Sequence, residues 1–117
     1  MMLLEISSEF RKGILFVRLK GKFLSEAMEL FKKEVIAKIE TCGLRSVVFN
    51  IDEVTEIDLK AIHNMLYVYE MCNKNAGKVL LCELYESPVF DRMRKNRIFN
   101  YVHLIKNELE AFEVIKL

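Results

Sequence analysis

The chain has 117 residues, with 18 Lys and Arg against 17 Asp and Glu, which gives a formal net charge of +1. A chain of this length can bury one core without disulfides or metal, so we expect residues 1–117 to form a single domain. The nearly neutral balance excludes binding to nucleic acid or to an anionic membrane that is driven by bulk charge.

The first part of the chain predicts two strands followed by an amphipathic helix. Residues 13–19 are rich in strand-forming side chains, and residues 3–6 could pair with them as a hairpin across residues 7–12. From Ser25, a good N-cap residue, apolar side chains recur at helical spacing until Gly43 ends the pattern. We expect this helix to lie with its apolar side on a sheet.

The middle of the chain predicts a strand, an acidic loop and a second helix. Residues 46–51 are mostly apolar without alternation, which is typical of a strand buried on both faces and therefore central in its sheet. After the acidic loop, apolar side chains at helical spacing predict a helix that ends near Asn75. Asp58 is expected to cap the start of this helix.

The last third predicts two more strands, each followed by a helix. Residues 78–84 have strand composition, and Ser87-Pro88 is typical of an N-cap followed by proline in the first helical position. Residues 101–105 predict a short last strand, and Asn107 is expected to cap the final helix.

The resulting order of elements is β-β-α-β-α-β-α-β-α. The later strands are separated by helices long enough for crossover connections, which favour parallel pairing, whereas the first two strands form a hairpin. We therefore expect the α/β class, with a mixed sheet covered by helices.

Four carboxylates within seven residues raise the question of a metal site. They are Asp52, Glu53, Glu56 and Asp58, and carboxylate oxygens are ligands for Mg²⁺ and Ca²⁺. Their spacing lacks the glycine and the distal glutamate of an EF-hand loop. We therefore interpret the stretch as a solvated loop and expect no bound metal or other cofactor.

No pattern in the sequence predicts catalysis. His63 and His103 are the two histidines, and neither lies in a spacing that suggests a nucleophile with its base. The four glycines form none of the phosphate-binding or nucleophile-elbow motifs. We therefore expect a protein without enzymatic activity.

The cysteines and the hydropathy pattern indicate a cytoplasmic protein. Cys42, Cys72 and Cys82 are odd in number and lack C-x-x-C spacing, which favours neither a disulfide framework nor a zinc site. The start of the chain lacks the basic region of a secretory signal. No apolar stretch approaches the ~20 residues that span a bilayer, so membrane insertion is not expected.

One side of the second helix has the composition of a protein interface. Lys60, His63, Asn64, Tyr67 and Met71 recur on the side opposite the apolar one, and they mix aromatic, polar and sulfur-containing side chains. A plainer interpretation is that Tyr67 and Met71 shield the helix edge. Lys60 is unusual because a cation near the N-terminus of a helix opposes the macrodipole, at a cost of ~0.3–1 kcal/mol.

Three short motifs, in the right order and at the right intervals, resemble the STAS domain family. In that family a strand is followed by polar residues and then by I-D-S-S-G-L at the start of a helix. Asn50-Ile51, Val54 and Ile57-Asp58 match this pattern, but Leu59-Lys60-Ala61 replaces S-S-G. The stretch 77–82 is similar to the family's G-x-x-hydrophobic strand, and 87–89 to its S-P-x-V helix start.

The resemblance is strongest to the small anti-sigma factor antagonists of bacteria, and it implies a non-enzymatic, regulatory protein-binding module. Such proteins alternate between a form that binds an anti-sigma factor kinase and a form that is phosphorylated on the second serine of the motif. Lys60 stands at the position of that serine and has no hydroxyl, so the switch is not expected there. Thr55 is a nearby hydroxyl, but its acidic surroundings disfavour a phosphate.

We therefore expect a partner, of which an anti-sigma factor kinase is one candidate, to contact a surface around Lys60. The predicted contact residues are Asp58, Lys60, His63, Asn64 and Tyr67. An alternative is a small-ligand or lipid-transport accessory protein of the same family. A pocket lined by Met65, Tyr69 and Met93 would indicate that second function.

Overall fold

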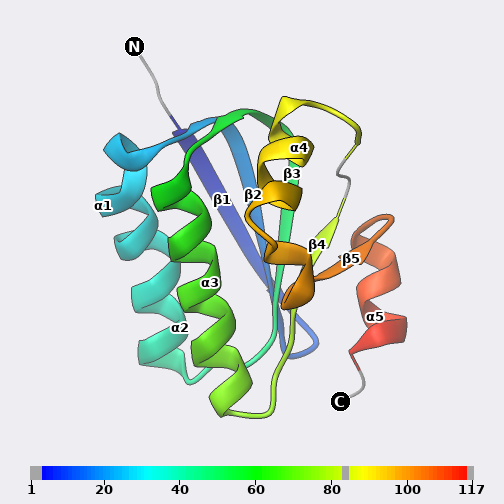
Figure 1. Cartoon of the computed structure of the whole chain (residues 1–117). Coiled ribbons are helices and arrows are strands. Elements are labelled where there is room, and N and C mark those ends of the chain that lie inside the picture. Colours follow the sequence, from blue (N-terminus) through cyan, green and yellow to red (C-terminus); the bar gives the residue numbers. More distant parts are fainter. Residues whose placement is uncertain (1–3, 83–84, 116–117) are drawn as a thin grey trace.

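A computed structural model describes residues 4–82 and 85–115 of the chain (Figure 1). Within these residues five strands form one mixed sheet in the spatial order β1-β2-β3-β4-β5. The strands are β1 Leu4–Arg11, β2 Ile14–Phe23, β3 Val47–Ile57, β4 Val79–Cys82 and β5 His103–Ile105. The first pair is antiparallel and the other three pairs are parallel, which confirms the predicted mixed sheet.

Helices follow the strands in the predicted order. The first helical stretch consists of a 3-10 turn Ser25–Ala27, α1 Met28–Phe31, a π-helical turn Lys32–Ile36 and α2 Ala37–Cys42. The later helices are α3 Leu59–Lys74, α4 Pro88–Lys95 and α5 Ala111–Val114, with 3-10 turns at Ile98–Asn100 and Glu108–Glu110. The β-β-α-β-α-β-α-β-α order is therefore confirmed.

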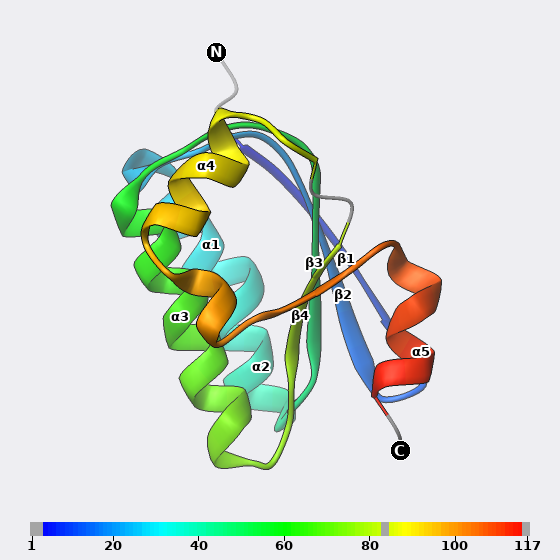
Figure 2. The ribbon, with the colours of Figure 1, turned by 45° about the vertical axis from the view of Figure 1, so that its right-hand side comes forward.

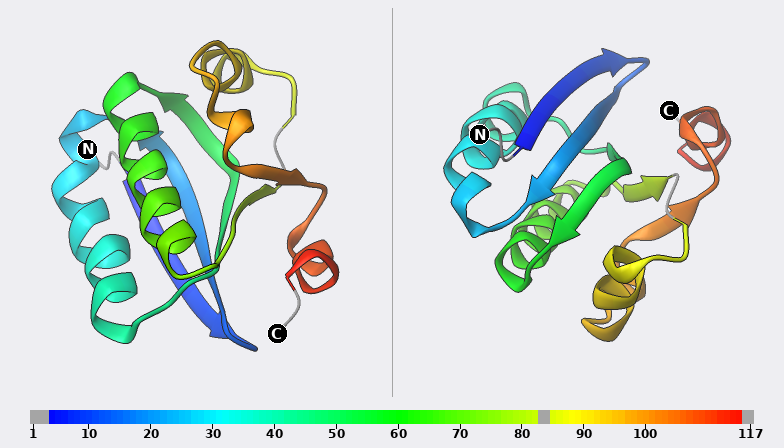
Figure 3. Two further views of the ribbon diagram at one scale, coloured as in Figure 1. Left: turned by 60° about the horizontal axis from the view of Figure 1, so that its bottom comes forward. Right: turned by 90° about the horizontal axis from the view of Figure 1, so that it is seen from above.

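The helices form layers on both faces of the sheet. Helices α1 to α4 lie on one face and α5 lies on the other, as Figures 2 and 3 show from different sides. The larger apolar core fills the space under α1 to α4, and a smaller one lies under α5. Strand β3 contributes Phe49 to the first core and Val48 to the second, so the prediction of a central strand buried on both faces is confirmed.

The first hairpin is longer than its sequence pattern indicated. Strand β1 continues to Arg11 and pairs in unbroken register with β2, from Leu4 opposite Gly21 to Arg11 opposite Ile14. The predicted end at residue 6 was wrong because the following side chains are polar. They lie on the outermost strand of the sheet, where exposed side chains give no apolar signal.

The acidic stretch is also a strand and not a loop. Strand β3 runs to Ile57 and keeps Val54 and Ile57 buried. The adjacent β2 places Lys20 3.7 Å from Glu53 and Lys22 3.4 Å from Glu56 across the parallel pair. Glu53 and Glu56 therefore each lie beside a lysine, which only the pairing of β2 with β3 could reveal. Within the described ranges no cluster of His, Cys, Asp and Glu has the geometry of a metal site.

The predicted helix boundaries are mostly confirmed. The side chains of Ser87 and Asn107 accept hydrogen bonds at the starts of α4 and the last 3-10 turn, from Phe90 N–H at 3.1 Å and Glu110 N–H at 3.1 Å. Gly43 ends α2 in a left-handed conformation with φ of 64°.

Three boundary predictions were wrong or extend beyond the description. The N-cap of the first helical stretch is Leu24, because the Ser25 hydroxyl bonds to the Glu26 carboxylate instead. Strand β4 begins at Val79 and not at residue 78, and β5 covers only His103–Ile105 of the predicted 101–105. Residues 3, 83 and 84 of the predicted strands lie outside the described residues.

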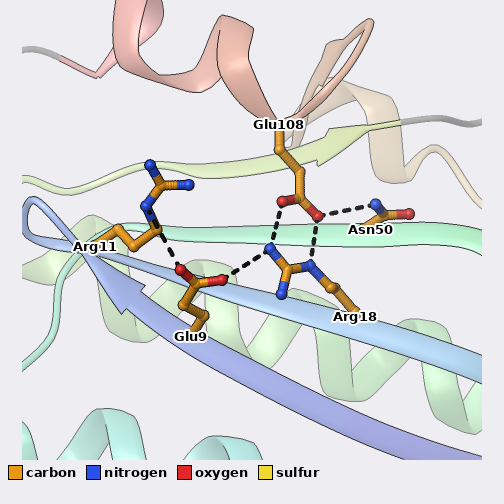
Figure 4. Close-up of polar contacts among 5 residues, drawn as sticks. All are labelled: Glu9, Arg11, Arg18, Asn50 and Glu108. Atoms are coloured by element: carbon orange, nitrogen blue, oxygen red, sulfur yellow. Dashed lines mark hydrogen bonds and ion pairs between the residues drawn. The ribbon is translucent and has the colours of Figure 1, made fainter.

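A charged network fastens the last segment of the chain to the sheet (Figure 4). The Arg18 guanidinium, on β2, donates to both carboxylate oxygens of Glu108, at 2.9 and 2.7 Å. The Asn50 amide donates to the same carboxylate at 2.9 Å. Arg18 also contacts Glu9 of β1 at 3.1 Å. The segment leading into α5 is thereby held over β2 and β3.

Candidate functional site

The start of α3 is fixed by the Asp58 carboxylate. One oxygen accepts a hydrogen bond from the Ala61 N–H at 2.9 Å, which confirms the predicted N-cap. The other oxygen accepts from the Ser25 N–H at 2.7 Å. One side chain therefore joins the first turn of α3 to the first helical stretch. The Asp58 carboxylate therefore positions both of these segments.

Lys60 lies in the first turn of α3 and is exposed to solvent. No ion-pair partner for its ammonium is found among residues 4–82 and 85–115. That first turn contains no acidic side chain apart from the N-cap. The charge therefore opposes the helix dipole, at a cost of about 0.3–1 kcal/mol.

A groove of about 500 Å³ lies beside this lysine, between the first helical stretch and α3. We call it the helix groove. Its lining residues are Lys32, Ile36, Ala37, Glu40, His63, Asn64 and Tyr67. The Tyr67 side chain is 47% exposed, so a large aromatic ring is available at the surface. The Asn64 amide donates to the Lys60 carbonyl at 2.9 Å, which restrains it along the helix.

The wall of the helix groove opposite α3 is irregular in its backbone. Lys32 and Ile36 belong to the π-helical turn between α1 and α2. Single π-helical turns within α-helices occur frequently at functional sites. The turn is an independent feature of the backbone at the same place as the groove.

The predicted contact residues are thus partly brought together. His63, Asn64 and Tyr67 line the helix groove, and Lys60 is one turn of α3 before Asn64. Met71, which continues the same stripe, lies further along α3 in a smaller depression with Ile39 and Leu44. Neither location tests whether these residues contact a partner.

Other sequence candidates have structural surroundings that explain them. The Thr55 hydroxyl donates to the Gly21 carbonyl at 3.3 Å across β2 and β3. Met65 and Met93 are completely buried in the larger core, and the Tyr69 ring packs on Tyr101 with centroids 5.4 Å apart. Met65 and Met93 therefore contribute to core packing, and Tyr69 packs against the same core.

Two features were missed by sequence reasoning. Nothing in the sequence indicates that Lys32, Ile36 and Glu40 face α3, because the pairing of two helices depends on how both lie on the sheet. The Arg18–Glu108 contact was also missed. Its members are polar residues at separate strand and turn positions, and no periodic pattern connects them.

Across the ranges that the structure describes, no helix is both long and apolar enough to cross a membrane.

Comparisons with known proteins agree with this architecture. The STAS domain family matches residues 5–111. A curated relative, the anti-sigma F factor antagonist of Paenibacillus polymyxa, is 21% identical over 114 residues, which covers 97% of both chains.

Solved structures with the same fold include bacterial regulators. A proposed anti-sigma factor antagonist from Thermotoga maritima superimposes with a TM-score of 0.85 and 16% identity, covering 94% of this chain and 93% of that one. The phosphorylated form of the Bacillus cell fate determinant SpoIIAA gives a TM-score of 0.72 and 16% identity, covering 96% of this chain and 100% of that one. At these identities the likeness concerns the fold.

Proposed function

Because the chain belongs to the STAS domain family, we propose that it is a regulatory protein-binding module without enzymatic activity. Residues 1–117 would act as one STAS domain in the cytoplasm. The name of the Paenibacillus relative supports an anti-sigma factor as the partner. The resemblance found in the sequence makes a kinase-type anti-sigma factor the first candidate.

The observation that carries the proposal is Lys60, which is exposed near the helix groove and has no ion-pair partner among residues 4–82 and 85–115. Its charge costs free energy at a helix N-terminus, and no contact among the described residues offsets that cost. A partner carboxylate placed over the first turn of α3 would offset it, because an anion also interacts favourably with the helix dipole. We therefore propose that the partner presents an acidic side chain to Lys60.

The helix groove supplies the rest of the proposed contact surface. His63, Asn64 and Tyr67 form its α3 wall, and Tyr67 is a residue type that often contributes strongly to binding. Ile36 and Ala37 provide apolar surface on the other wall, and Lys32 adds a second positive charge. Asp58 supports the surface by holding both helical segments and is a positioning residue.

The proposed interaction differs from a phosphate-controlled one. A phosphate adds roughly −1.5 to −2 charges, whereas lysine carries a permanent positive charge of the opposite sign. Lys60 has no hydroxyl that could be phosphorylated like that of serine. Its positive charge also cannot imitate the phosphorylated state. Binding through this position would therefore persist without a phosphatase.

Binding of the purified protein to the anti-sigma factor encoded in the same genome tests the proposal by calorimetry. Lys60→Glu is expected to weaken the complex by at least about tenfold, which corresponds to 1.4 kcal/mol. Tyr67→Ala is expected to weaken it by a similar factor, since it removes the aromatic surface of the groove.

Lys106→Glu provides a matched control, because it reverses an exposed charge on the segment between β5 and α5. It should leave affinity unchanged. Equal affinity of the Lys60→Glu variant and the unaltered protein would remove this surface from the interface. Absence of any complex with the unaltered protein would contradict the anti-sigma factor as partner.

A further inference from the structure

Strand β1 forms a long edge of the sheet, and no strand among residues 4–82 and 85–115 pairs with its outer side. It is the first strand in the order β1-β2-β3-β4-β5, and the view from above in Figure 3 shows it at one border of the sheet. All eight of its residues pair in unbroken register with β2, without a bulge. The outward N–H and C=O groups of such a strand can pair with another strand.

The opposite edge of the sheet is protected in a way that β1 is not. Strand β5 has only 3 residues, which is a common way of preventing edge-to-edge pairing. Strand β1 contains no proline and no lysine, and its register has no irregularity. Among the protective devices of edge strands it therefore has only its charged side chains, and the arrangement of those charges matters.

The two ends of β1 carry charges of opposite sign, and each end also has one apolar side chain that is not fully buried. Glu5 lies near the start, and within the described residues it has no ion-pair partner. Arg11 lies at the end, where its contact of 3.5 Å with Glu9 is an exposed pair, a type that holds its members weakly, and its guanidinium also lies 5.6 Å from the centre of the Phe112 ring. On the other face, Ile6 is half-buried near the start and Phe10 is 56% exposed near the end.

We propose that β1 pairs antiparallel with β1 of a second copy of this chain, about a two-fold axis at Ser8. This register places Glu5 opposite Arg11 of the second copy, and Ile6 opposite Phe10 of the second copy. The two-fold axis generates each pair twice. Opposite charges and apolar side chains that face one another across an antiparallel pair both stabilise a sheet. The two five-stranded sheets would join into one.

Neighbouring registers are less favourable. Opposite residues must point to the same face of the sheet, so the two-fold axis can move only by whole residues along the strand. With the axis at Ser7, Glu5 would face Glu9 of the second copy. With the axis at Glu9, the Glu9 carboxylates of the two copies would face each other. Like charges directly opposite each other destabilise a strand pair, and only the Ser8 register avoids both.

One group at the proposed axis must move. Lys38 donates to the Ser8 hydroxyl at 2.9 Å, so the two copies of its ammonium would approach each other. Lys38 is exposed, and a lysine head on a flexible stem can turn into solvent. The interface uses no residue of the helix groove, so the proposal is independent of the proposed function.

Sedimentation equilibrium of the purified chain over a wide concentration range tests the pairing. The unaltered protein is expected to show a monomer–dimer equilibrium. Glu5→Arg and Arg11→Glu should each raise the dimer dissociation constant about tenfold, because each places two like-charged pairs in the interface. Combining both substitutions should restore the original constant. Lys33→Glu, an exposed charge reversal on the π-helical turn, should leave the constant unchanged.

Cross-linking tests the register itself. In a Cys42→Ser background, which removes the exposed natural cysteine, Ser8→Cys should form a disulfide-linked dimer on oxidation, since the two copies lie opposite each other. Ser7→Cys should cross-link poorly, because its counterpart lies two residues along the strand. Circular dichroism checks that each variant remains folded.

Three results would overturn the proposal. A protein that stays monomeric at the highest concentration reached does not pair through β1. A dimer that is insensitive to both single charge reversals uses another surface. Efficient cross-linking at position 7 but not at position 8 would show a different register.

Discussion

The guanidinium of Arg18 and the carboxylate of Glu108 form a bidentate ion pair, although the two residues are 90 positions apart in the chain. The hydrogen bonds from Arg18, assisted by the one from Asn50, hold the pKa of Glu108 below its ordinary value, and the same contact raises the pKa of Arg18. This contact fastens the segment before α5 to the sheet. The Arg11 guanidinium adds to it by lying 5.6 Å from the centre of the Phe112 ring.

Replacing Glu108 by glutamine should destabilise the protein. The change keeps the size of the side chain but removes the charge that Arg18 and Asn50 bind, and we expect a loss of about 1–2 kcal/mol in the free energy of unfolding. Urea denaturation followed by circular dichroism measures it. Glu113→Gln, at an exposed position of α5, is the control and should change stability little. Equal losses in both variants would show that the ion pair contributes nothing specific.

The contribution of Glu108 should depend on pH in a defined direction. Its pKa in the folded protein is lower than the ordinary 4.5, so the folded state binds its proton less tightly than the unfolded state does. The stabilisation is therefore fully present well above pH 4.5 and is lost as the pH falls through the lowered pKa. The stability difference between the unaltered protein and Glu108→Gln should be constant near neutral pH and should shrink below about pH 4.5. A difference that grows on acidification would contradict this assignment.

Asp58 should contribute to stability through two helix starts. Asp58→Ala removes the acceptors for the Ala61 and Ser25 N–H groups, and we expect a loss of about 1–2 kcal/mol. Asp58→Asn keeps one good acceptor for the N-cap bond and should lose less. Thermal and urea unfolding of both variants gives the order. If both lose the same amount, the negative charge is required and not only the acceptor.

Lys60→Glu should make the folded protein more stable while it weakens partner binding. A carboxylate in the first turn of α3 favours the helix dipole, so we expect a gain of roughly 0.3–1 kcal/mol in the free energy of unfolding at low salt. Urea unfolding at low and high salt measures this gain, which should diminish with salt. Loss of stability would indicate that Lys60 has a favourable contact in the folded protein.

Lys60→Ser tests the relation of this position to the family's phosphorylated serine. If the partner is a kinase-type anti-sigma factor, the variant should acquire one phosphate when incubated with that partner and ATP, as measured by intact-mass spectrometry. The phosphorylated Lys60→Ser variant should then bind the partner more weakly than the unaltered protein does, because a phosphate of roughly −1.5 to −2 charges replaces the positive charge of Lys60. The unaltered protein should remain unmodified. Phosphate on Thr55 of the unaltered protein would contradict the absence of a phosphate switch.

Two glycine substitutions should differ in cost for a steric reason. A Cβ at Gly77 would overlap the carbonyl of Arg45, so Gly77→Ala forces the backbone between α3 and β4 to move. Gly43 has a left-handed φ of 64° but open space around it, so Gly43→Ala costs only the conformational strain, about 1–2 kcal/mol. Urea unfolding should therefore rank Gly77→Ala as clearly more destabilising. The reverse order would exclude the close approach to Arg45.

Much of the fold could be predicted because its signals are local. The capping residues Asp58, Ser87 and Asn107 each accept from the N–H group three positions later, so these capping roles follow from sequence alone. The apolar run before Asn50 needs cover on both faces wherever it lies, which makes it central. The order of elements then limited the topology to a hairpin followed by crossovers.

The extents of the strands depended on their neighbours. The polar second half of β1 and the acidic end of β3 have no apolar pattern of their own. They become strands because β2 is long enough to pair with both, and because Lys20 and Lys22 then lie beside Glu53 and Glu56.

The sequence by itself determined the class of fold, the order of its elements and the unusual cation at position 60, because each of these depends on residue type and short-range spacing. The tertiary structure alone decided that Lys32 and Ile36 face His63 and Tyr67 across a groove, and that Arg18 meets Glu108. Such contacts join distant parts of the chain. They form only when the packing of the helices on both faces of the sheet fixes where each side chain lies.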